Sequence, residues 1–387
     1  MMDFDFQWLL LALPVAFALG WLASRLDLRQ WKREQRESPK AYFKGLNLLL
    51  NEQQDKAIDA FIEAVQHDPD TSDLRFALGN LFRRRGEYER AVRVHQHLLN
   101  RADLPAAERD RAQLGLAQDY MKAGVFDRAE EAFKALEGTA FDTEARLALL
   151  TLHERSRDWR AAVDDAQKLE RSSATGSYAS RIAHYWCELA IEADAKQQTA
   201  DGDAAIRKAR EAAPQAPRPM AVAGERARKA GDPTQAVQHW RQLLGTHPAA
   251  FSLVARDFAV STSAIGEQPQ ALQELLALYE RHPSLDLLGA IELLEPQPAV
   301  HRERVTAHLA KHPSLSAARE LLRLRIAERG SGDETEVKNI EAAIARATQP
   351  LQRYRCAACG FEVQHYFWQC PGCLNWDSLP TQRLEDL

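Results

Sequence analysis

The sequence has few cysteines and little net charge of either sign. Only five of its 387 residues are cysteine, and 50 basic against 55 acidic residues leave a net charge of −5. Secreted domains held by disulfides are far richer in cysteine. A chain without excess positive charge also offers no general field for nucleic-acid phosphates. We therefore expect neither a disulfide-stapled domain nor a nucleic-acid-binding protein.

The sequence also lacks the common catalytic fingerprints. It contains no nucleophile elbow, P-loop, dinucleotide-binding glycine motif or HExxH, and these are the motifs that position nucleophiles, phosphates, cofactors or catalytic zinc. Apolar residues make up 45% of the chain, enough for a substantial core. We predict a protein that binds partners, with no catalytic residues.

An uncharged run opens the chain. Residues 6–24 carry no charge over about nineteen positions, close to the roughly 20 residues that a helix needs to cross a bilayer. Asp3 and Asp5 precede the run, while Arg25 and further basic residues follow it. A cleaved signal peptide would carry positive charge before its apolar segment. The asymmetry predicts a retained single-pass anchor with the N-terminus outside and the bulk of the chain in the cytoplasm, where thiols stay reduced.

A repeat fills the middle of the chain. Seven segments, beginning with "KAIDAFIEAVQHDPD" and ending with "QALQELLALYERHP", recur at steps of roughly 31 to 43 residues, centred near the 34 of tetratricopeptide repeats. Each has a small residue near its start: Ala57, Ala91, Ala129, Ala162, Ala205, Ala236 and Ala271. Aromatic residues follow some of these at a fixed offset (Phe61, Phe133 and Trp240), and turn glycines precede others (Gly86, Gly124, Gly231 and Gly266). We predict pairs of antiparallel helices whose small residues permit close crossing.

The pattern resembles the tetratricopeptide-repeat family, whose arrays form superhelices with a concave surface for peptides or partner helices. By their offsets in the predicted first helices, we assign the following residues to a partner-binding groove: Asn80, Arg83, Arg84, Gln118, Lys122, Arg155 and Arg228. A solvated helix face explains their charges equally well.

Two Cys-x-x-Cys pairs lie near the end of the chain. Cys356 and Cys359 form the first pair, and Cys370 and Cys373 form the second. Four cysteines in two such knuckles match a tetrahedral site for one ion, iron or zinc. The stretches "YRCAACGF" and "CPGC" resemble the halves of a rubredoxin-like or zinc-ribbon module, although rubredoxins place a longer segment between them. So short a lobe needs its metal to fold.

The cysteine lobe has more aromatic residues than its own core needs. We assign to docking on the last repeats the following residues: Tyr354, Phe361, Tyr366, Phe367, Trp368 and Trp376. A nucleic-acid stacking platform is the weaker interpretation, because acidic residues balance the nearby arginines.

Together these features predict an all-α tetratricopeptide-repeat superhelix with an N-terminal transmembrane helix and a small C-terminal rubredoxin-like or zinc-ribbon β lobe. The predicted boundaries are a transmembrane signal-anchor at 1–24, a basic juxtamembrane linker at 25–38, the repeat array at 39–348 and the metal-binding lobe at 349–387.

This combination resembles the lipopolysaccharide assembly protein B family of bacterial inner-membrane proteins. The resemblance implies an adaptor that works with the membrane protease FtsH to promote degradation of the deacetylase LpxC, and that answers to an inner-membrane protein sensing lipopolysaccharide. It also implies that the cysteines of both pairs are metal ligands. The alternative from another class is a membrane-bound electron carrier that uses a rubredoxin-like iron site. A homodimer is compatible with either function.

Overall fold

A computed structural model describes residues 53–67, 72–172, 176–329 and 334–386, together with positions 17, 21, 44, 45, 47, 48 and 51. Except for Phe17 and Trp21, the predicted anchor and the juxtamembrane linker lie outside these residues. Within the described part of the chain, no helix combines the length and the apolar character needed to cross a membrane.

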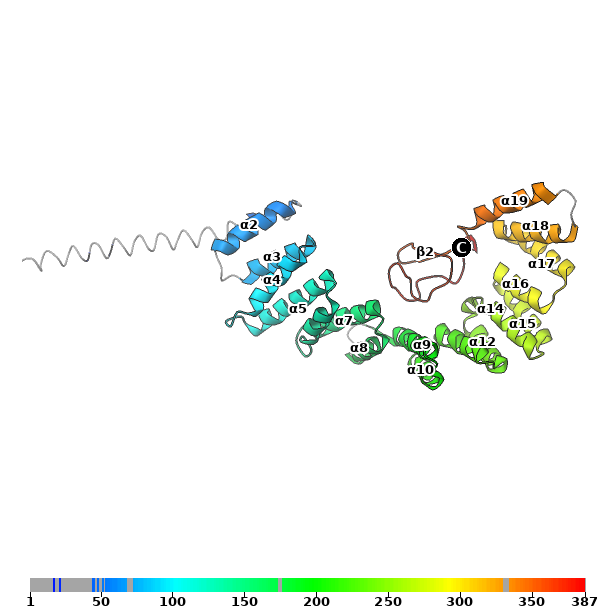
Figure 1. Ribbon diagram of the computed structural model, residues 1–387, viewed down its shortest axis with the longest axis horizontal. Coiled ribbons are helices and arrows are strands. Elements are labelled where there is room, and N and C mark those ends of the chain that lie inside the picture. Colours follow the sequence, from blue (N-terminus) through cyan, green and yellow to red (C-terminus); the bar gives the residue numbers. More distant parts are fainter. Residues whose placement is uncertain are drawn as a thin grey trace, which may run out of the picture. The chain divides into compact units, whose positions relative to one another are not determined.

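The described residues are mainly helical, and a small lobe with short strands follows the last helix (Figure 1). The helices are α2 (Gln54–His67), α3 (Ser72–Arg84), α4 (Tyr88–Leu99), α5 (Ala106–Ala123), α6 (Phe126–Lys134), α7 (Asp142–Ser156), α8 (Trp159–Ser172), α9 (Ala179–Ala195), α10 (Thr199–Ala212), α11 (Pro217–Lys229), α12 (Pro233–Thr246), α13 (Pro248–Phe251), α14 (Ala255–Ala264), α15 (Gln268–Arg281), α16 (Leu285–Leu294), α17 (Pro298–Lys311), α18 (Leu315–Arg329) and α19 (Glu334–Thr348). The lobe contains β1 (Tyr354–Arg355), β2 (Glu362–Val363) and the 3-10 helix η1 (Leu384–Asp386).

The chain divides into two compact units, residues 1–152 and 153–387. In the first, α3 packs on α4, α4 on α5 and α5 on α6. In the second, α9 packs on α10, α11 on α12, α14 on α15 and α18 on α19. The seven repeated segments, each the second helix of a predicted pair, correspond to α2, α4, α6, α8, α10, α12 and α15. The prediction of successive helix pairs is therefore confirmed for the pairs named in this paragraph.

Glycines close several of the turns between paired helices. The four predicted turn glycines all have φ between 76° and 81°: Gly86, Gly124, Gly231 and Gly266. In this left-handed region glycine pays no Cβ penalty. Arg157 stands at the same offset before Ala162 and also has a positive φ of 58°. The turn geometry thus persists where the glycine is missing.

Small residues on one helix leave room for a ring on another, sixteen positions later in the sequence. A Cβ on Gly45 would lie 2.9 Å from the Phe61 ring, and a Cβ on Gly224 would overlap the indole of Trp240. His95 takes the same place against Gly79, where the added carbon would lie 2.6 Å from its ring. The sequence periodicity predicted the aromatic residues at this position but missed His95, because its side chain is not typical of an apolar core.

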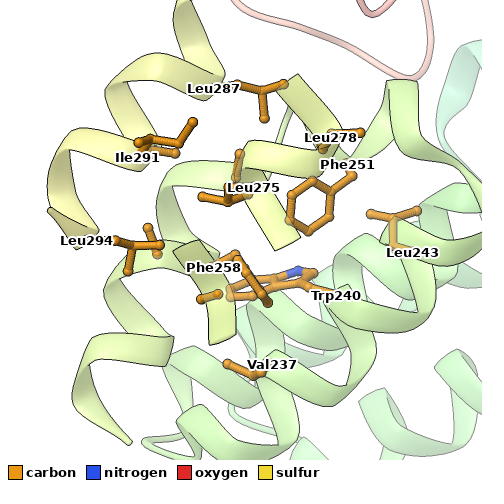
Figure 2. Close-up of a cluster of buried hydrophobic side chains, with 14 of the residues drawn as sticks. Val237, Trp240, Leu243, Phe251, Phe258, Leu275, Leu278, Leu287, Ile291 and Leu294 are labelled. Carbon is orange, nitrogen blue, oxygen red and sulfur yellow. The ribbon is translucent and has the colours of Figure 1, made fainter. Parts of the chain in front are cut away.

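The largest core of the second unit surrounds Trp240. Its indole is fully buried among Phe251, Phe258 and Leu275, and Phe251 and Phe258 meet edge to face with centroids 5.2 Å apart (Figure 2). The cluster extends to Ile291 on α16. One continuous core therefore joins α11 to α16, and Trp368 of the cysteine lobe packs against it.

Candidate metal centre

The first cysteine knuckle lies inside a short hairpin. Strand β1 pairs antiparallel with β2, with Tyr354 opposite Val363. Cys356 N donates to Phe361 O over 2.9 Å, and Gly360 N donates to Cys356 O over 2.9 Å. Gly360 adopts a φ of 76°, which a residue with a Cβ would rarely adopt. The turn directs both thiols of this knuckle toward the same point.

The second knuckle repeats these backbone hydrogen bonds. Cys370 N donates to Asn375 O over 2.9 Å, and Leu374 N donates to Cys370 O over 2.8 Å. Gly372 lies beneath the Phe361 ring, where an added Cβ would stand 2.9 Å from Cγ. The glycine therefore allows the two knuckles to approach each other closely.

The four sulfurs are arranged as the ligands of one metal ion. The distance between Sγ atoms is 3.8 Å for Cys356 and Cys373, and 3.8 Å for Cys359 and Cys370. All four ligand atoms lie within 4.8 Å of one another. A tetrahedron with metal–sulfur bonds of about 2.3 Å has edges of about 3.8 Å. The residues present therefore fit a single tetrahedral ion, zinc or iron.

The surroundings of the first sulfur favour its thiolate form. Burial raises the pKa of Cys356, but Ser378 Oγ, 3.3 Å from the sulfur, and the backbone amides of Ala358 and Cys359 lower it to about 6. The other ligands differ: against the backbone amide of Phe361, burial and hydrogen bonds with the other cysteines raise the pKa of Cys359 to about 12, and burial raises the pKa of Cys370. Cys187 on α9 lies outside this cluster, and burial raises the pKa of its thiol to about 12. Because thiolates are the metal-binding form, Cys356 is the ligand best prepared for a metal, and the arrangement of the four sulfurs is what sets the site apart from Cys187.

Trp376 of the lobe packs against the helical repeats of the second unit. Its indole stacks on His184 of α9, with centroids 4.6 Å apart and planes at 14°. It also meets Trp159 and Tyr185 edge to face, with centroids 6.0 Å and 5.9 Å away. The Arg218 guanidinium lies 5.3 Å from the centre of the indole. Aromatic and cation–π contacts thus surround this one side chain on several helices.

A buried carboxylate lies beneath this aromatic cluster. Glu154 is only 6% exposed, and its Oε1 accepts hydrogen bonds from Trp376 Nε1 at 2.9 Å and from Tyr185 Oη at 2.5 Å. Arg181 donates to both carboxylate oxygens at 2.7 and 2.8 Å. A buried charge is tolerated when it is paired and hydrogen-bonded, and the lobe supplies one of the donors.

Further polar contacts fix the lobe along the unit. Asp377 Oδ2 lies 2.8 Å from His184 Nε2, and Arg383 contacts both oxygens of Asp286 on α16 at 3.0 and 3.2 Å. Glu385 accepts a hydrogen bond from the backbone of Ser316 at 3.0 Å. The lobe therefore bridges α9, α16 and α18.

The predicted docking aromatics divide into three groups. Trp376 and Trp368 contact the repeats, the latter beside His184 and the large core. Tyr354 and Tyr366 pack edge to face within the lobe, with centroids 5.6 Å apart. The others, Phe361 and Phe367, are 47% and 45% exposed.

The predicted groove residues of the first unit are mostly engaged within that unit. Arg83 donates to Asp119 at 2.8 Å and to Asn80 at 2.6 Å, and Asp119 also contacts the buried His95 at 2.5 Å. Gln118 donates to Glu144 at 3.0 Å. Arg84 and Lys122 are exposed.

In the second unit, Arg155 is exposed, and Arg228 lies 3.8 Å from Asp257. A groove function of these residues and of those in the first unit stays a prediction.

Sequence reasoning missed the repeat side of the docking interface. Glu154, His184 and Arg218 come from separate helices, and no spacing connects them with the cysteines. One signal was available in the sequence. The repeat periodicity assigns some charged residues to the helix interior, and a buried charge requires a partner from elsewhere in the chain.

The chain is similar to known proteins over nearly its whole length. Residues 354–380 match the family described as "Rubredoxin metal binding domain". Over 387 residues the chain is 30% identical to lipopolysaccharide assembly protein B of Escherichia coli K12, covering 98% of this chain and 99% of the relative. Identity to the protein of the same name from Haemophilus influenzae is 26%, covering 96% and 97%.

Among solved structures, a tetratricopeptide repeat protein from Parabacteroides merdae is similar, with a TM-score of 0.34 and 13% identity, covering 66% of this chain and 98% of that one. The helix packing described above, and not this score, defines the fold of the present chain.

Proposed function

Because the chain belongs to the lipopolysaccharide assembly protein B family, we propose that it is a membrane-anchored cytoplasmic adaptor that regulates lipopolysaccharide synthesis. In this proposal it presents the deacetylase LpxC to the membrane protease FtsH, and an inner-membrane protein that senses lipopolysaccharide controls it. The chain acts without catalysis of its own. The observation that carries the proposal is the match to relatives of this name over 98% of the chain.

The fold supports an adaptor in two ways. Successive helix pairs expose long faces that suit peptides and partner helices. The proposed anchor, residues 1–24, would confine the chain to the surface in which FtsH lies, so modest contacts suffice through a raised effective concentration. The metal lobe stiffens one part of this surface, since it joins α9, α16 and α18 through Asp377, Arg383 and Glu385.

The four-cysteine centre has a structural part in this proposal. A bound zinc or iron supplies folding free energy to the lobe. The chain's own groups hold the sulfurs in place, orient Trp376 toward Glu154 and cover the buried carboxylate. The electron-transfer alternative has no support in the comparisons, because the relatives are named for assembly.

The test is the lifetime of LpxC in cells whose own copy of this gene is deleted. We expect LpxC to decay several-fold more slowly in the deletion strain, and the full chain to restore decay only while FtsH is active. The double variant Cys370→Ser/Cys373→Ser should restore decay poorly, whereas Phe367→Leu, on an exposed position of the same lobe, should restore it fully. Equal LpxC lifetimes with and without the chain would refute the proposal.

A further inference from the structure

A second group of metal-ligating side chains lies on the repeats, apart from the cysteine lobe. Glu292 on α16, His301 on α17 and Glu320 on α18 place their ligand atoms within 4.8 Å of one another. His301 is 2% exposed, whereas the two glutamates are partly open to solvent. A buried imidazole thus faces two carboxylates at the surface, each from a different helix.

The distances do not correspond to ordinary hydrogen bonds. His301 Nε2 lies 3.5 Å from Glu292 Oε2 and 3.7 Å from Glu320 Oε1, while N–H···O hydrogen bonds are about 2.7–3.2 Å long. Two ligands that share a tetrahedral zinc with bonds of about 2.0–2.1 Å lie about 3.3–3.4 Å apart. The observed separations are close to this spacing.

Neither neutral form of the imidazole is well satisfied. With the proton on Nδ1, the Nε2 lone pair faces two carboxylates, which repel it. With the proton on Nε2, the ring donates over distances that are long for a hydrogen bond. Nδ1 is buried and has no hydrogen-bond partner among the described residues. A cation between Nε2 and the carboxylates removes the repulsion, because the lone pair then serves as its ligand.

The local charge also favours a cation. Two carboxylates face the ring, and one positive group contacts them, Arg323, whose Nη2 lies 2.9 Å from Glu320 Oε1. The net charge of the group is negative. Arg323 competes with a metal for the same oxygen of Glu320, so it lowers the affinity of the site for the metal.

We propose that Glu292, His301 and Glu320 form a second metal site, for a divalent ion such as zinc, that clamps α16, α17 and α18 together. One nitrogen and two oxygen ligands leave a fourth position for water, as in open zinc sites. The competing arrangement is an imidazolium paired with both carboxylates, which would bind no metal. This inference does not depend on the proposed function.

The experiment uses the full chain with its cysteine centre already loaded with zinc. Equilibrium dialysis against Zn²⁺, followed by metal analysis, should give two ions per chain for the native protein. His301→Gln and Glu320→Gln should each bind one ion, with affinity for the second lowered more than about tenfold, since losing a direct ligand costs at least as much as losing its outer partner. Glu303→Gln, an exposed glutamate on α17, is the matched control and should bind two.

Cobalt, loaded into both sites of the same variants in place of zinc, distinguishes the two sites. Co²⁺ bound by cysteines gives an intense thiolate charge-transfer band, whereas a nitrogen and oxygen site gives only weak visible bands. His301→Gln should lose the weak bands and keep the thiolate band of a cobalt-loaded lobe, which also shows that the variant is folded. Arg323→Gln should bind the second ion several-fold more tightly.

Two results would overturn the site. One is a stoichiometry of one ion in the native chain, which is the imidazolium outcome. The other is a second ion that His301→Gln and Glu320→Gln retain. An affinity that does not rise in Arg323→Gln would contradict the role of Glu320 as a ligand.

Discussion

Trp376 Nε1 donates a hydrogen bond to Glu154 Oε1 over 2.9 Å, although 222 positions separate the two residues in the chain. The carboxylate is buried, and its other partners, Arg181 and Tyr185, come from α9. The metal lobe thus completes the solvation of a charge that belongs to the repeats. Docking of the lobe and stability of this part of the array are therefore expected to change together.

Removing only this donor should loosen the lobe. Trp376→Phe keeps an aromatic ring against His184 but leaves Glu154 with one donor fewer, and losing a hydrogen bond to a buried charged group costs about 1.5–3 kcal/mol. We expect a lower free energy of unfolding in denaturant and faster proteolysis within the lobe. Phe367→Leu, on the exposed face, should stay within about 0.5 kcal/mol of the native protein. Equal losses in both variants would contradict a specific role of the hydrogen bond.

Acid should weaken the same interface as the pH falls below 6.5. Burial and the positive charge of Arg218 lower the pKa of His184 below its ordinary 6.5, while Asp377 and Glu188 act in the opposite direction. The folded state therefore prefers the neutral ring, and its contribution to stability is lost as pH falls through 6.5 toward the lowered pKa. The pKa of Asp377 is itself lowered from 3.8, so its own contribution is lost only at more acid pH.

Unfolding free energies measured from pH 7.5 down to 5.5 test this sign. The native chain should lose more stability over this range than His184→Gln, whose side chain does not titrate. A steeper loss in the variant would mean that the folded state favours the imidazolium.

The sequence predicted the repetitive parts of the fold and missed the parts that depend on one contact. Turn glycines such as Gly231, and the small residues that leave room for a ring sixteen positions later, recur because every helix pair meets the same steric demand. The cysteine spacing likewise predicts the metal ligands, since two residues between ligands fix a local turn. Glu154, His184 and Arg218 lie far from the lobe in the sequence and contact it only in the folded chain. No repeat period or cysteine spacing therefore predicts these contacts.

The close approach at Gly224 should be intolerant of a single methyl group. Gly224→Ala places a Cβ against the indole of Trp240, and overpacking of this kind costs about 1–3 kcal/mol. Gly245→Ala on α12 meets nothing within 4 Å and should be neutral or stabilising by up to about 1 kcal/mol, because alanine is the better helix former. Thermal unfolding compares the two, and similar melting temperatures for both variants would contradict the packing argument.

Replacing Arg157 with the glycine found in the other turns should stabilise the protein. A positive φ of 58° is unfavourable for arginine, and glycine adopts it without a Cβ clash. Arg157→Gly should raise the free energy of unfolding by about 0.5–1 kcal/mol, because relief of a left-handed penalty of about 1–2 kcal/mol is partly offset by the entropic cost of ordering glycine, about 0.5–1 kcal/mol. A loss of stability would show that the arginine side chain contributes more than its backbone costs.

Metal removal should unfold the lobe and spare the helices. A strong chelator under reducing conditions, or Cys370→Ser, takes away the folding energy of the four-cysteine centre. Far-ultraviolet circular dichroism should stay almost unchanged, whereas tryptophan fluorescence should report the exposure of Trp376 and Trp368. Native fluorescence after complete metal loss, confirmed by metal analysis, would show that packing alone holds the lobe.

The separation of Trp376 from Glu154 also has a consequence in time. At about 5–20 residues per second, the ribosome adds Trp376 about 11–44 s after Glu154, since 222 positions lie between them. During that interval the new repeats carry a carboxylate without its last donor and an aromatic cluster without its cover. When the lobe docks, Trp376 supplies the missing hydrogen bond to the carboxylate and covers the aromatic cluster. In a growing chain, docking therefore marks the point at which the second unit has been made through residue 376, and chaperones or proteases that recognise open apolar surface would act before it.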